Sequence, residues 1–573
     1  MNIQHETILL SVIQSNPTTL AAFTRAKTRI CNQLKTTQPA NRHLLEAYQN
    51  LAKKKRITKD KTFEEFLRKA AVRSQSGIAI ITSLVKPYMC PGKCIYCPTE
   101  VRMPKSYIAT EPAAARALRL DFSPYEQMRQ RIEMLETNGH PTDKIEFIIK
   151  GGTWNTYPLQ YQYWFILESL RACNNVRIAN LLRQRTDPPE VENMRITQLN
   201  EHSPLFELQA ALEIEQRKNE RAKHRLIGIT LETRPDAISP RTIAHMRRQG
   251  CTRIELGLQT PDDEILNLIR RGHTVQQFTD AMFLLRQAGF KVDLHFMPDL
   301  PGTTAAHDVT MYKSLFSDPG LKPDMVKIYP NTVIKSAELY QWFLDGRYQS
   351  YGDESLFEAL LEMKLATPRW CRISRLIRDI PETEIEHGNK ITNLRELLAA
   401  RLKEKGLRCQ CLRCREIGRV AKIRDIRNNR NNRDIQDIDE SCKLFIEQYE
   451  TTGGIEYFLS HEDKERNAVF GFLRLRIPTA TVPADLLKLL PELKTAAFIR
   501  ELHVYGQQVR IHDQKEKASQ HKGLGKKLVE EAEKIAKTAG FKKLAIISGV
   551  GVRGYYRKLG YRKVETYMVK KLK

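Results

Sequence analysis

The sequence has no apolar run of about 18 residues, so it offers no candidate transmembrane helix. Its first residues, MNIQHETILLSVIQSNP, lack the charged segment, apolar stretch and small-residue cleavage site of a secretory signal. Cysteines number only 11 in 573 residues, and outside two clusters they are scattered. This pattern argues against a disulfide-stapled secreted scaffold. We therefore expect a cytoplasmic protein that makes no membrane contact and uses its clustered cysteines as ligands.

Acidic residues are in the minority, and the formal net charge is +26. Much of the excess is local: residues 1–75 contain 14 Lys/Arg against 5 Asp/Glu, and residues 401–433 contain 12 against 3. A run of charge is often only a solvated surface. Two separate basic stretches in one enzyme-sized chain nevertheless favour a polyanionic partner, to which binding should weaken as salt rises.

Strand-like apolar runs alternate with amphipathic helical patterns through the middle of the chain. The predicted strands are Gly77–Val85, Lys144–Lys150, Arg225–Leu231, Thr252–Leu258, Lys291–Met297 and Asp324–Tyr329. The predicted helices between them include Pro112–Leu135, Pro158–Cys173, Ser239–Gln249, Gln277–Ala288 and Ala305–Phe316. Apolar strands joined by crossover helices predict an α/β fold with a parallel sheet. Six units predict a partial (β/α)6 barrel that binds ligands at the carboxyl ends of its strands.

Cys90, Cys94 and Cys97 directly follow the first predicted strand, in the segment MCPGKCIYCPTE. Three thiolates can hold three irons of a four-iron cluster and leave the fourth iron free to chelate the amino and carboxyl groups of a small molecule. A structural zinc site needs four protein ligands, and none stands beside Cys97. Zinc with a distant fourth ligand remains an alternative.

Three further predicted strands also end in polar or glycine-rich segments. The second leads into Gly151, Gly152 and Thr153, whose backbone carbonyls could hold an ammonium group. The third ends at Glu232 and Arg234, which could bind ribose hydroxyls and a carboxylate respectively, and the fourth offers Gln259. Any one of these would more often be an ordinary surface or core group. Four consecutive strand ends of this kind favour a small-molecule site.

The C-x-x-x-C-x-x-C pattern, followed by a GGT turn after the next strand, resembles the radical S-adenosylmethionine (SAM) superfamily. More narrowly, SGIAIITSLVKPYMCPGKCIYCP, SYIATEPAAARALR, GITLETRPD, ELGLQTPDDEILNLIRRGHT and HFMPDLPG resemble the catalytic subunit of Elongator, a family of enzymes that modify the wobble uridine of tRNA. The resemblance runs from about Val72 to the end of the chain. It implies a [4Fe–4S] cluster on the three cysteines, with SAM bound at the strand ends.

Near the C-terminus a predicted strand, Arg500–Gly506, precedes the segment QHKGLGKKLVEEAEKIA, in which glycines open a helix. Amide groups at such a helix start can receive a pyrophosphate. Together with KKLAIISG and GVRGYYRKLGYRKV, the segment resembles the GNAT acetyltransferase fold. The resemblance implies an acetyl-CoA site, with the pyrophosphate at Gln520, Gly523, Leu524, Gly525 and Lys526, the thioester near Leu502, His503 and Val504, and Tyr555 and Tyr556 at its reactive end. At least one of the two tyrosines could instead simply fill a core.

A second cluster, Cys409, Cys411 and Cys414, predicts another metal site, because thiolates this crowded would otherwise repel or oxidise. Zinc is the first choice and a second iron–sulfur cluster the alternative. The family resemblance implies a histidine upstream as the fourth ligand, and His387 is the nearest candidate.

The expected organisation has four parts: a basic helical tRNA-binding region (1–75), a radical SAM core (76–345), a linker with the zinc-type cysteines (346–435) and a GNAT-like domain (436–573). Residues 424–440 have the composition of a linker.

By resemblance, the reaction is carboxymethylation of the wobble uridine at C5, with a SAM-derived 5′-deoxyadenosyl radical and acetyl-CoA as acyl donor. The anticodon stem-loop of tRNA and an electron-donor protein would be its partners, residues 53–61 the outer tRNA contact, and a homodimer is possible. Two other hypotheses are a protein lysine acetyltransferase with a structural iron–sulfur domain, and a metabolite-directed radical SAM enzyme.

Overall fold

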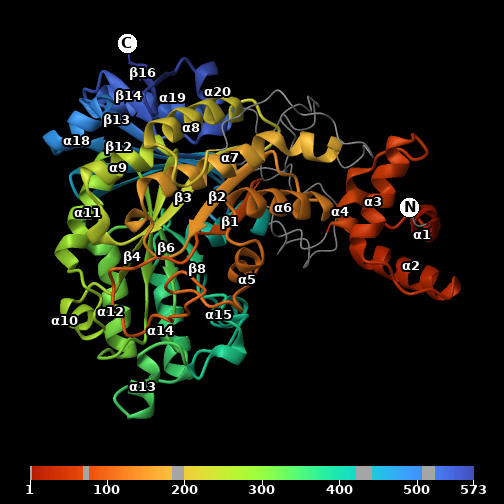
Figure 1. The fold of residues 1–573 in the computed structure, drawn as a ribbon, viewed down its shortest axis with the longest axis horizontal. Helices are drawn as coiled ribbons and strands as arrows, with labels where there is room; N and C mark the ends of the chain where they lie inside the picture. Colours follow the sequence, from red (N-terminus) through yellow and green to blue (C-terminus); the bar gives the residue numbers. More distant parts are fainter. Residues whose placement is uncertain (1–2, 69–76, 183–198, 421–441, 506–522, 573) are drawn as a thin grey trace.

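Figure 1 shows the fold of the chain in a computed structural model. The structure describes residues 3–68, 77–182, 199–420, 442–505 and 523–572. The linker predicted at 424–440 and Gln520 therefore lie outside the described residues. No described helix combines the length and the apolarity that a bilayer span requires.

Four helices at the N-terminus form a small bundle beside the main body (Figure 1): α1 (Ile3–Gln14), α2 (Leu20–Gln33), α3 (Asn41–Lys53) and α4 (Lys61–Leu67). The bundle has its own apolar core, in which Phe23 and Tyr48 contact Phe63. It meets the main body where the Nε of Arg68 donates to the backbone oxygen of Gly139 (3.0 Å). The predicted helical character of this region is confirmed, and its basic stretch forms the loop between α3 and α4.

The parallel sheet predicted for the middle of the chain is confirmed. Its strands are β1 (Ala79–Leu84), β2 (Lys144–Lys150), β3 (Arg225–Thr233), β4 (Cys251–Gln259), β5 (Lys291–Phe296), β6 (Met325–Ile328) and β8 (Arg372–Arg375), in the order β1-β2-β3-β4-β5-β6-β8. Every neighbouring pair is parallel, which is the arrangement of an incomplete barrel. The seventh strand, β8, extends the expected six.

Helices cover the outside of this sheet (Figure 1). They are α5 (Pro112–Arg119), α6 (Pro124–Thr137), α7 (Leu159–Leu182), α8 (Leu205–Asn219), α9 (Pro240–Arg248), α11 (Val275–Gln287) and α12 (Ala305–Ser317). The short helix α10 (Asp263–Leu268) instead lies beside the loop after β1, where the backbone amide of Ile95 donates to the backbone oxygen of Ile269 (3.2 Å). The single helix predicted over Pro112–Leu135 is wrong. Asp121 and Phe122 have positive φ (47° and 52°), which ends α5, and the hydroxyl of Ser123 caps a new helix at Pro124.

The segment beyond Tyr340 contains regular structure. It holds α13 (Leu339–Leu344), α14 (Asp353–Ala366), α15 (Leu394–Glu404), β8 and a two-residue strand β9 (His387–Gly388) that pairs with β7 (Thr332–Val333). β8 is not among the predicted strands, because a four-residue strand reading Arg-Ile-Ser-Arg has too little apolar content to be recognised.

The C-terminal domain is built on a second seven-stranded sheet, in the order β10-β11-β12-β13-β14-β16-β15. Its elements are β10 (Lys443–Thr451), β11 (Gly454–Glu462), β12 (Val469–Pro478), α18 (Ala484–Leu489), β13 (Ala497–Val504), α19 (Leu524–Thr538), β14 (Lys543–Ile546), α20 (Arg553–Lys558), β15 (Arg562–Val564) and β16 (Tyr567–Lys571). One pair, β13 with β14, is parallel and the others are antiparallel. The amphipathic helix α19 buries Leu528, Val529 and Ala532 against this sheet.

A fully buried ion-pair cluster joins the two sheets. Asp324, at the start of β6, lies 3.0 Å from Arg286 of α11 and 2.5 Å from Arg500 of β13. Arg474 of β12 approaches the same carboxylate, and Glu456 of β11 bonds Arg500 as well (2.9 Å). Burial opposes the charge of Asp324, but the surrounding guanidinium groups hold the pKa of its carboxyl well below the usual value. The barrel and the C-terminal domain therefore share one polar core.

Candidate functional site

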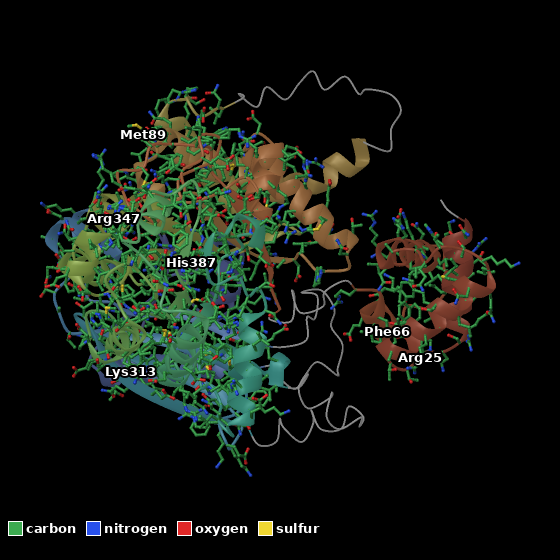
Figure 2. The ribbon with its side chains drawn as sticks, turned by 90° about the horizontal axis from the view of Figure 1, so that it is seen from below. Arg25, Phe66, Met89, Lys313, Arg347 and His387 are labelled. Carbon is green, nitrogen blue, oxygen red and sulfur yellow. The ribbon has the colours of Figure 1, made fainter. Side chains whose placement is uncertain are left out.

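The first cysteine cluster lies in the loop after β1, at the carboxyl end of the barrel sheet. Cys94 is buried, while Cys90 and Cys97 are partly exposed. The Sγ of Cys90 lies 3.8 Å from the hydroxyl of Thr153, so the structure brings the cysteine loop against the glycine-rich turn after β2. Figure 2 shows the neighbouring Met89 at the surface of the main body, and its side chain is 84% exposed. The loop thus has one side against the barrel mouth and one side towards solvent.

The two cysteine clusters differ in the spacing of their sulfurs. Among the described residues, Cys409, Cys411 and Cys414 form a group whose Sγ atoms all lie within 4.8 Å of one another, whereas the first triplet does not form such a group. Thiolates on one tetrahedral zinc are separated by about 4 Å, because each Zn–S bond is about 2.3 Å long. The compact second triplet therefore fits a single ion. The wider first triplet fits a polynuclear centre, in which each thiolate binds a different iron.

Two buried arginines lie beneath the first cysteine loop. The Nη1 of Arg271 lies 3.5 Å from the Sγ of Cys94. Arg234 donates to Asp236 (2.9 Å) and to the backbone oxygen of Arg271 (2.8 Å), while its buried Nη1 has no partner within the described residues. A Cβ at Gly92 would collide with that Nη1, so the loop needs glycine there. Burial alone would raise the pKa of Cys94, but the charges of Arg271 and Arg234 bring it below its ordinary value.

The turn after β2 has a backbone conformation that favours glycine. Gly151 and Gly152 have φ of +141° and +88°, a region that residues with a side chain rarely adopt. A Cβ at Gly151 would also collide with Val85 at the end of β1. The turn therefore lies close to the cysteine loop, with Gly151 buried and Gly152 partly exposed.

The interior of the barrel contains a buried network of charge. Glu232, at the end of β3, accepts a hydrogen bond from the hydroxyl of Tyr107 (2.7 Å). Glu255 of β4 lies 3.2 Å from the Nζ of Lys150 and forms a second ion pair with Lys327 of β6. Burial opposes ionisation of Glu255, yet the two ammonium groups hold its pKa well below the usual value.

These interior groups bear on metal binding and on the sequence analysis. Glu232, Glu255 and His295 lie within 4.8 Å of one another, but the adjacent lysines already supply positive charge, which argues against a metal ion there. Gln259, a predicted ligand, has φ +79° and a buried Oε1 without a hydrogen-bond partner among the described residues. The sequence analysis missed Lys150, Glu255, Lys327 and Arg271, although Arg271 stands inside the quoted segment NLIRRGHT.

In the C-terminal domain, α19 begins where the pyrophosphate loop was predicted. Gly523 forms its N-cap with φ +116°, and Leu524 is buried behind it. A Cβ at Gly525 would lie 2.7 Å from the hydroxyl of Tyr555, so this tyrosine reaches the start of the helix. Tyr556 instead packs in the domain core. Lys526 is exposed and pairs with Glu530 (3.5 Å) on the same helix.

The end of β13 carries the residues predicted to lie near a thioester, Leu502, His503 and Val504. Burial lowers the pKa of His503 to about 4. Partial burial of the neighbouring Glu501 opposes its ionisation, but Lys291 and Arg474 lower its pKa to about 2. Neither group titrates near neutral pH.

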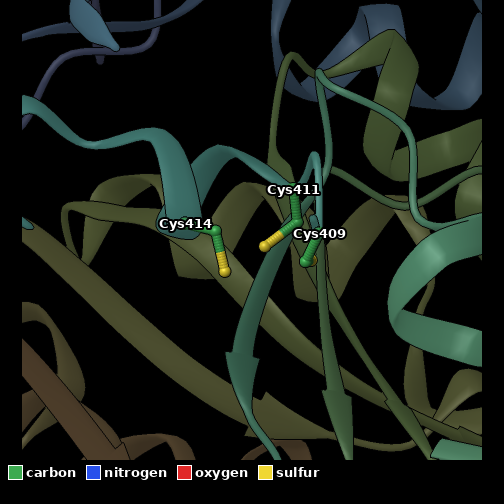
Figure 3. Close-up of side chains that lie close together, drawn as sticks. All are labelled: Cys409, Cys411 and Cys414. Carbon is green, nitrogen blue, oxygen red and sulfur yellow. The ribbon is translucent and has the colours of Figure 1, made fainter. Parts of the chain in front are cut away.

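The second cysteine cluster is shown in Figure 3, with the three side chains directed towards one another. The structure does not bring His387 into this group. Its Nε2 lies 3.0 Å from the hydroxyl of Ser350, and its ring stacks on Phe343 with centroids 4.6 Å apart. Of the predicted ligands, the three thiols are therefore together and the histidine is engaged elsewhere.

Comparison with known families covers most of the chain. Residues 84–315 match the radical SAM superfamily, residues 323–404 match the radical SAM C-terminal domain, and residues 425–561 match the acetyltransferase (GNAT) family. The first match implies SAM and a [4Fe–4S] cluster, and the third implies acetyl-CoA.

Close relatives exist in all three domains of life. The chain is 41% identical to a Methanocaldococcus jannaschii protein named tRNA uridine(34) acetyltransferase, over 88% of this chain and 86% of that one. A Dehalococcoides mccartyi protein of the same name is 38% identical, over 87% of this chain and 99% of that one. Human Elongator complex protein 3 is 36% identical, over 88% of this chain and 86% of that one.

A solved structure agrees with these matches. The archaeal Methanocaldococcus infernus Elp3 with an N-terminal deletion is 38% identical and superposes with a TM-score of 0.67, over 87% of this chain and 100% of that one. The chain therefore belongs to the family of Elongator complex protein 3 and the tRNA uridine(34) acetyltransferases, in which a radical SAM domain is followed by a GNAT acetyltransferase domain.

Proposed function

We propose that the protein carboxymethylates C5 of the wobble uridine in tRNA, with SAM as the radical source and acetyl-CoA as the acyl donor. The observation that carries this proposal is the buried cluster around Asp324, which packs the cysteine-bearing barrel and the acetyltransferase sheet into one body. A reaction that joins an acyl-derived carbon to a base by radical chemistry needs both centres in a fixed relation. The relatives' names specify uridine(34) of tRNA as their substrate.

Cys90, Cys94 and Cys97 would hold the cluster, which would supply the electron for reductive cleavage of SAM to methionine and a 5′-deoxyadenosyl radical. The partnerless Nη1 of Arg234 suits the carboxylate of SAM, because it is a buried cationic donor directly beneath the cysteine loop. Gly151 and Gly152 offer backbone carbonyls for the amino group. Glu232 would bind the ribose hydroxyls.

The start of α19 would bind the pyrophosphate of acetyl-CoA. Among the described residues, a Cβ at Gly523 would meet nothing within 4 Å, and the helix start offers amide groups and the positive end of the helix dipole. Tyr555, which reaches the same helix, would lie at the reactive end.

The compact triplet of Cys409, Cys411 and Cys414 would bind zinc. In this arrangement His387 is held by Ser350 and Phe343, so we expect the fourth ligand to be another group. The ion would brace the segment between β8 and the C-terminal domain, because Leu412 donates to the backbone oxygen of Cys371 (2.9 Å) just before β8.

The tRNA would contact the basic surfaces of the chain. Lys53, Lys54 and Lys55 lie at the end of α3 on the N-terminal bundle, and all three are exposed or nearly so. The anticodon loop presents single-stranded bases, and the wobble base must leave its stack to enter a buried site. The reaction would take place in the cytoplasm and depend on an electron-donor protein.

Nucleoside mass spectrometry tests this proposal directly. Anaerobic reaction of tRNA with SAM, acetyl-CoA and a reductant should yield carboxymethyluridine with the unaltered protein, and none with Cys94→Ala or Gly523→Glu. Acetylated uridine or unmodified tRNA would refute the proposed product.

The alternative function, protein lysine acetylation, would need a general base near the thioester, and the two titratable residues on β13 do not suit that role. Glu501 and His503 on β13 have pKa values of about 2 and about 4, too low for efficient proton abstraction near neutral pH.

A further inference from the structure

We propose that Arg271 is a positioning residue that makes the cluster on Cys90, Cys94 and Cys97 easier to reduce. The inference rests on the cluster assignment in the proposed function. It adds a residue that neither the sequence analysis nor the comparisons assign to that site.

The guanidinium of Arg271 is held by three separate contacts. Its Nη1 points at the Sγ of Cys94 (3.5 Å), its Nη2 donates to the backbone oxygen of Gly257 (2.7 Å), and its Nε donates to the Nε2 of His273 (3.1 Å). Arg271 is only 6% exposed. The Nδ1 of His273 lies 3.3 Å from the backbone oxygen of Thr274, to which it can donate, so the Nε2 of a neutral ring can accept from Arg271.

The surrounding backbone is shaped to admit this side chain. A Cβ at Gly257 of β4 would lie 2.6 Å from the Nη2 of Arg271. A larger residue at that strand position would therefore displace the guanidinium from the cysteine loop. The backbone oxygen of Arg271 also accepts from Arg234 (2.8 Å), which links the two arginines beneath the loop.

No carboxylate forms an ion pair with Arg271 among the described residues, and its Nη1 faces the sulfur of Cys94, which would be a thiolate as a cluster ligand. A cluster that accepts one electron gains one negative charge. A buried, permanently charged guanidinium beside a ligand sulfur stabilises that reduced form, because charge interacts strongly at low dielectric. Hydrogen bonds to cluster sulfurs act in the same direction. Arg271 thus raises the reduction potential of the cluster, so that a weaker reductant can reduce it.

The neighbouring Arg270 provides a matched control. It carries the same charge one residue away, but its side chain is 54% exposed and pairs with Glu338 (2.9 Å) at the surface. Solvent screens such a charge, so its removal should leave the cluster nearly unaffected.

The test is a redox titration of the anaerobically iron-loaded full chain, monitored by electron paramagnetic resonance of the reduced cluster. Arg271→Met should lower the ratio of reduced to oxidised cluster at a fixed potential at least tenfold, which corresponds to a midpoint lower by at least 59 mV for one electron. Arg271→Gln keeps a hydrogen-bond donor but no charge, and its midpoint potential should also lie below that of the unaltered protein. For Arg270→Met, the ratio of reduced to oxidised cluster at that potential should stay within twofold of the ratio in the unaltered protein.

The outcomes separate this inference from the proposed function. Iron-loaded Arg271 variants with an unchanged midpoint would overturn the role of Arg271 alone. If Arg271→Met fails to assemble its cluster, the midpoint potential of Arg271→Gln is the test. A midpoint of Arg271→Gln at or above that of the unaltered protein would overturn the inference. Zinc in place of iron on the unaltered protein would refute the cluster assignment itself.

Discussion

Replacement of Asp324 by asparagine tests whether the barrel and the acetyltransferase sheet depend on their shared polar core. The substitution keeps the shape of the side chain and removes the charge that neutralises Arg286, Arg474 and Arg500. Removing one partner of a buried ion pair costs about 3–5 kcal/mol, because the remaining charges stay buried without compensation. Glu456 still contacts Arg286 and Arg500, so we expect the lower end, about 3 kcal/mol.

Urea-induced unfolding, followed by near-ultraviolet circular dichroism, measures this loss. Glu338→Gln is the control, since its partner Arg270 is a surface residue and such pairs contribute about 0–1 kcal/mol. If Asp324→Asn and Glu338→Gln destabilise the protein equally, the cluster does not hold the domains together.

The same substitution should change the response to acid. The pKa of Asp324 is lower in the folded chain than the value of about 3.9 expected when unfolded. Its contribution is therefore complete above about pH 4 and is lost as the pH falls through the folded pKa. Asp324→Asn should remove that part of the acid dependence, and an unchanged acid-unfolding profile would contradict the assignment.

Further substitutions probe each candidate site separately. Cys94→Ala should abolish the iron–sulfur absorbance and SAM cleavage while acetyl-CoA affinity, measured by calorimetry, stays unchanged. Gly523→Glu should weaken acetyl-CoA binding at least tenfold and leave SAM cleavage intact, because a carboxylate there would meet the pyrophosphate; equal affinity would refute the loop assignment. Cys411→Ser should remove the bound zinc measured by elemental analysis and lower the thermal midpoint, whereas retained zinc would exclude this thiol as a ligand.

Local signals in the sequence predicted the strands of the barrel and the positions of both cysteine clusters. Runs such as Lys144–Lys150 are apolar and short, and the glycines after them break the strand, so neither feature depends on distant residues. The interior network was missed for the opposite reason. Lys150, Glu255 and Lys327 come from three different strands, and each appears in the sequence as an ordinary charged residue within or at the end of a strand. Their pairing depends on the closure of the sheet.

The two buried arginine clusters differ in one respect that separates structural from functional charge. Around Asp324, every arginine has a carboxylate within reach, so the positive charge is neutralised by the protein itself. Beneath the first cysteine loop, Arg234 pairs with Asp236, but its Nη1 has no hydrogen-bond partner among the described residues, and Arg271 faces the thiol of Cys94. A buried cationic group that lacks a full set of acceptors is costly unless an anion arrives. Under the proposed function, the two arginines would therefore be preorganised for anionic groups, namely the cluster thiolates and the carboxylate of SAM.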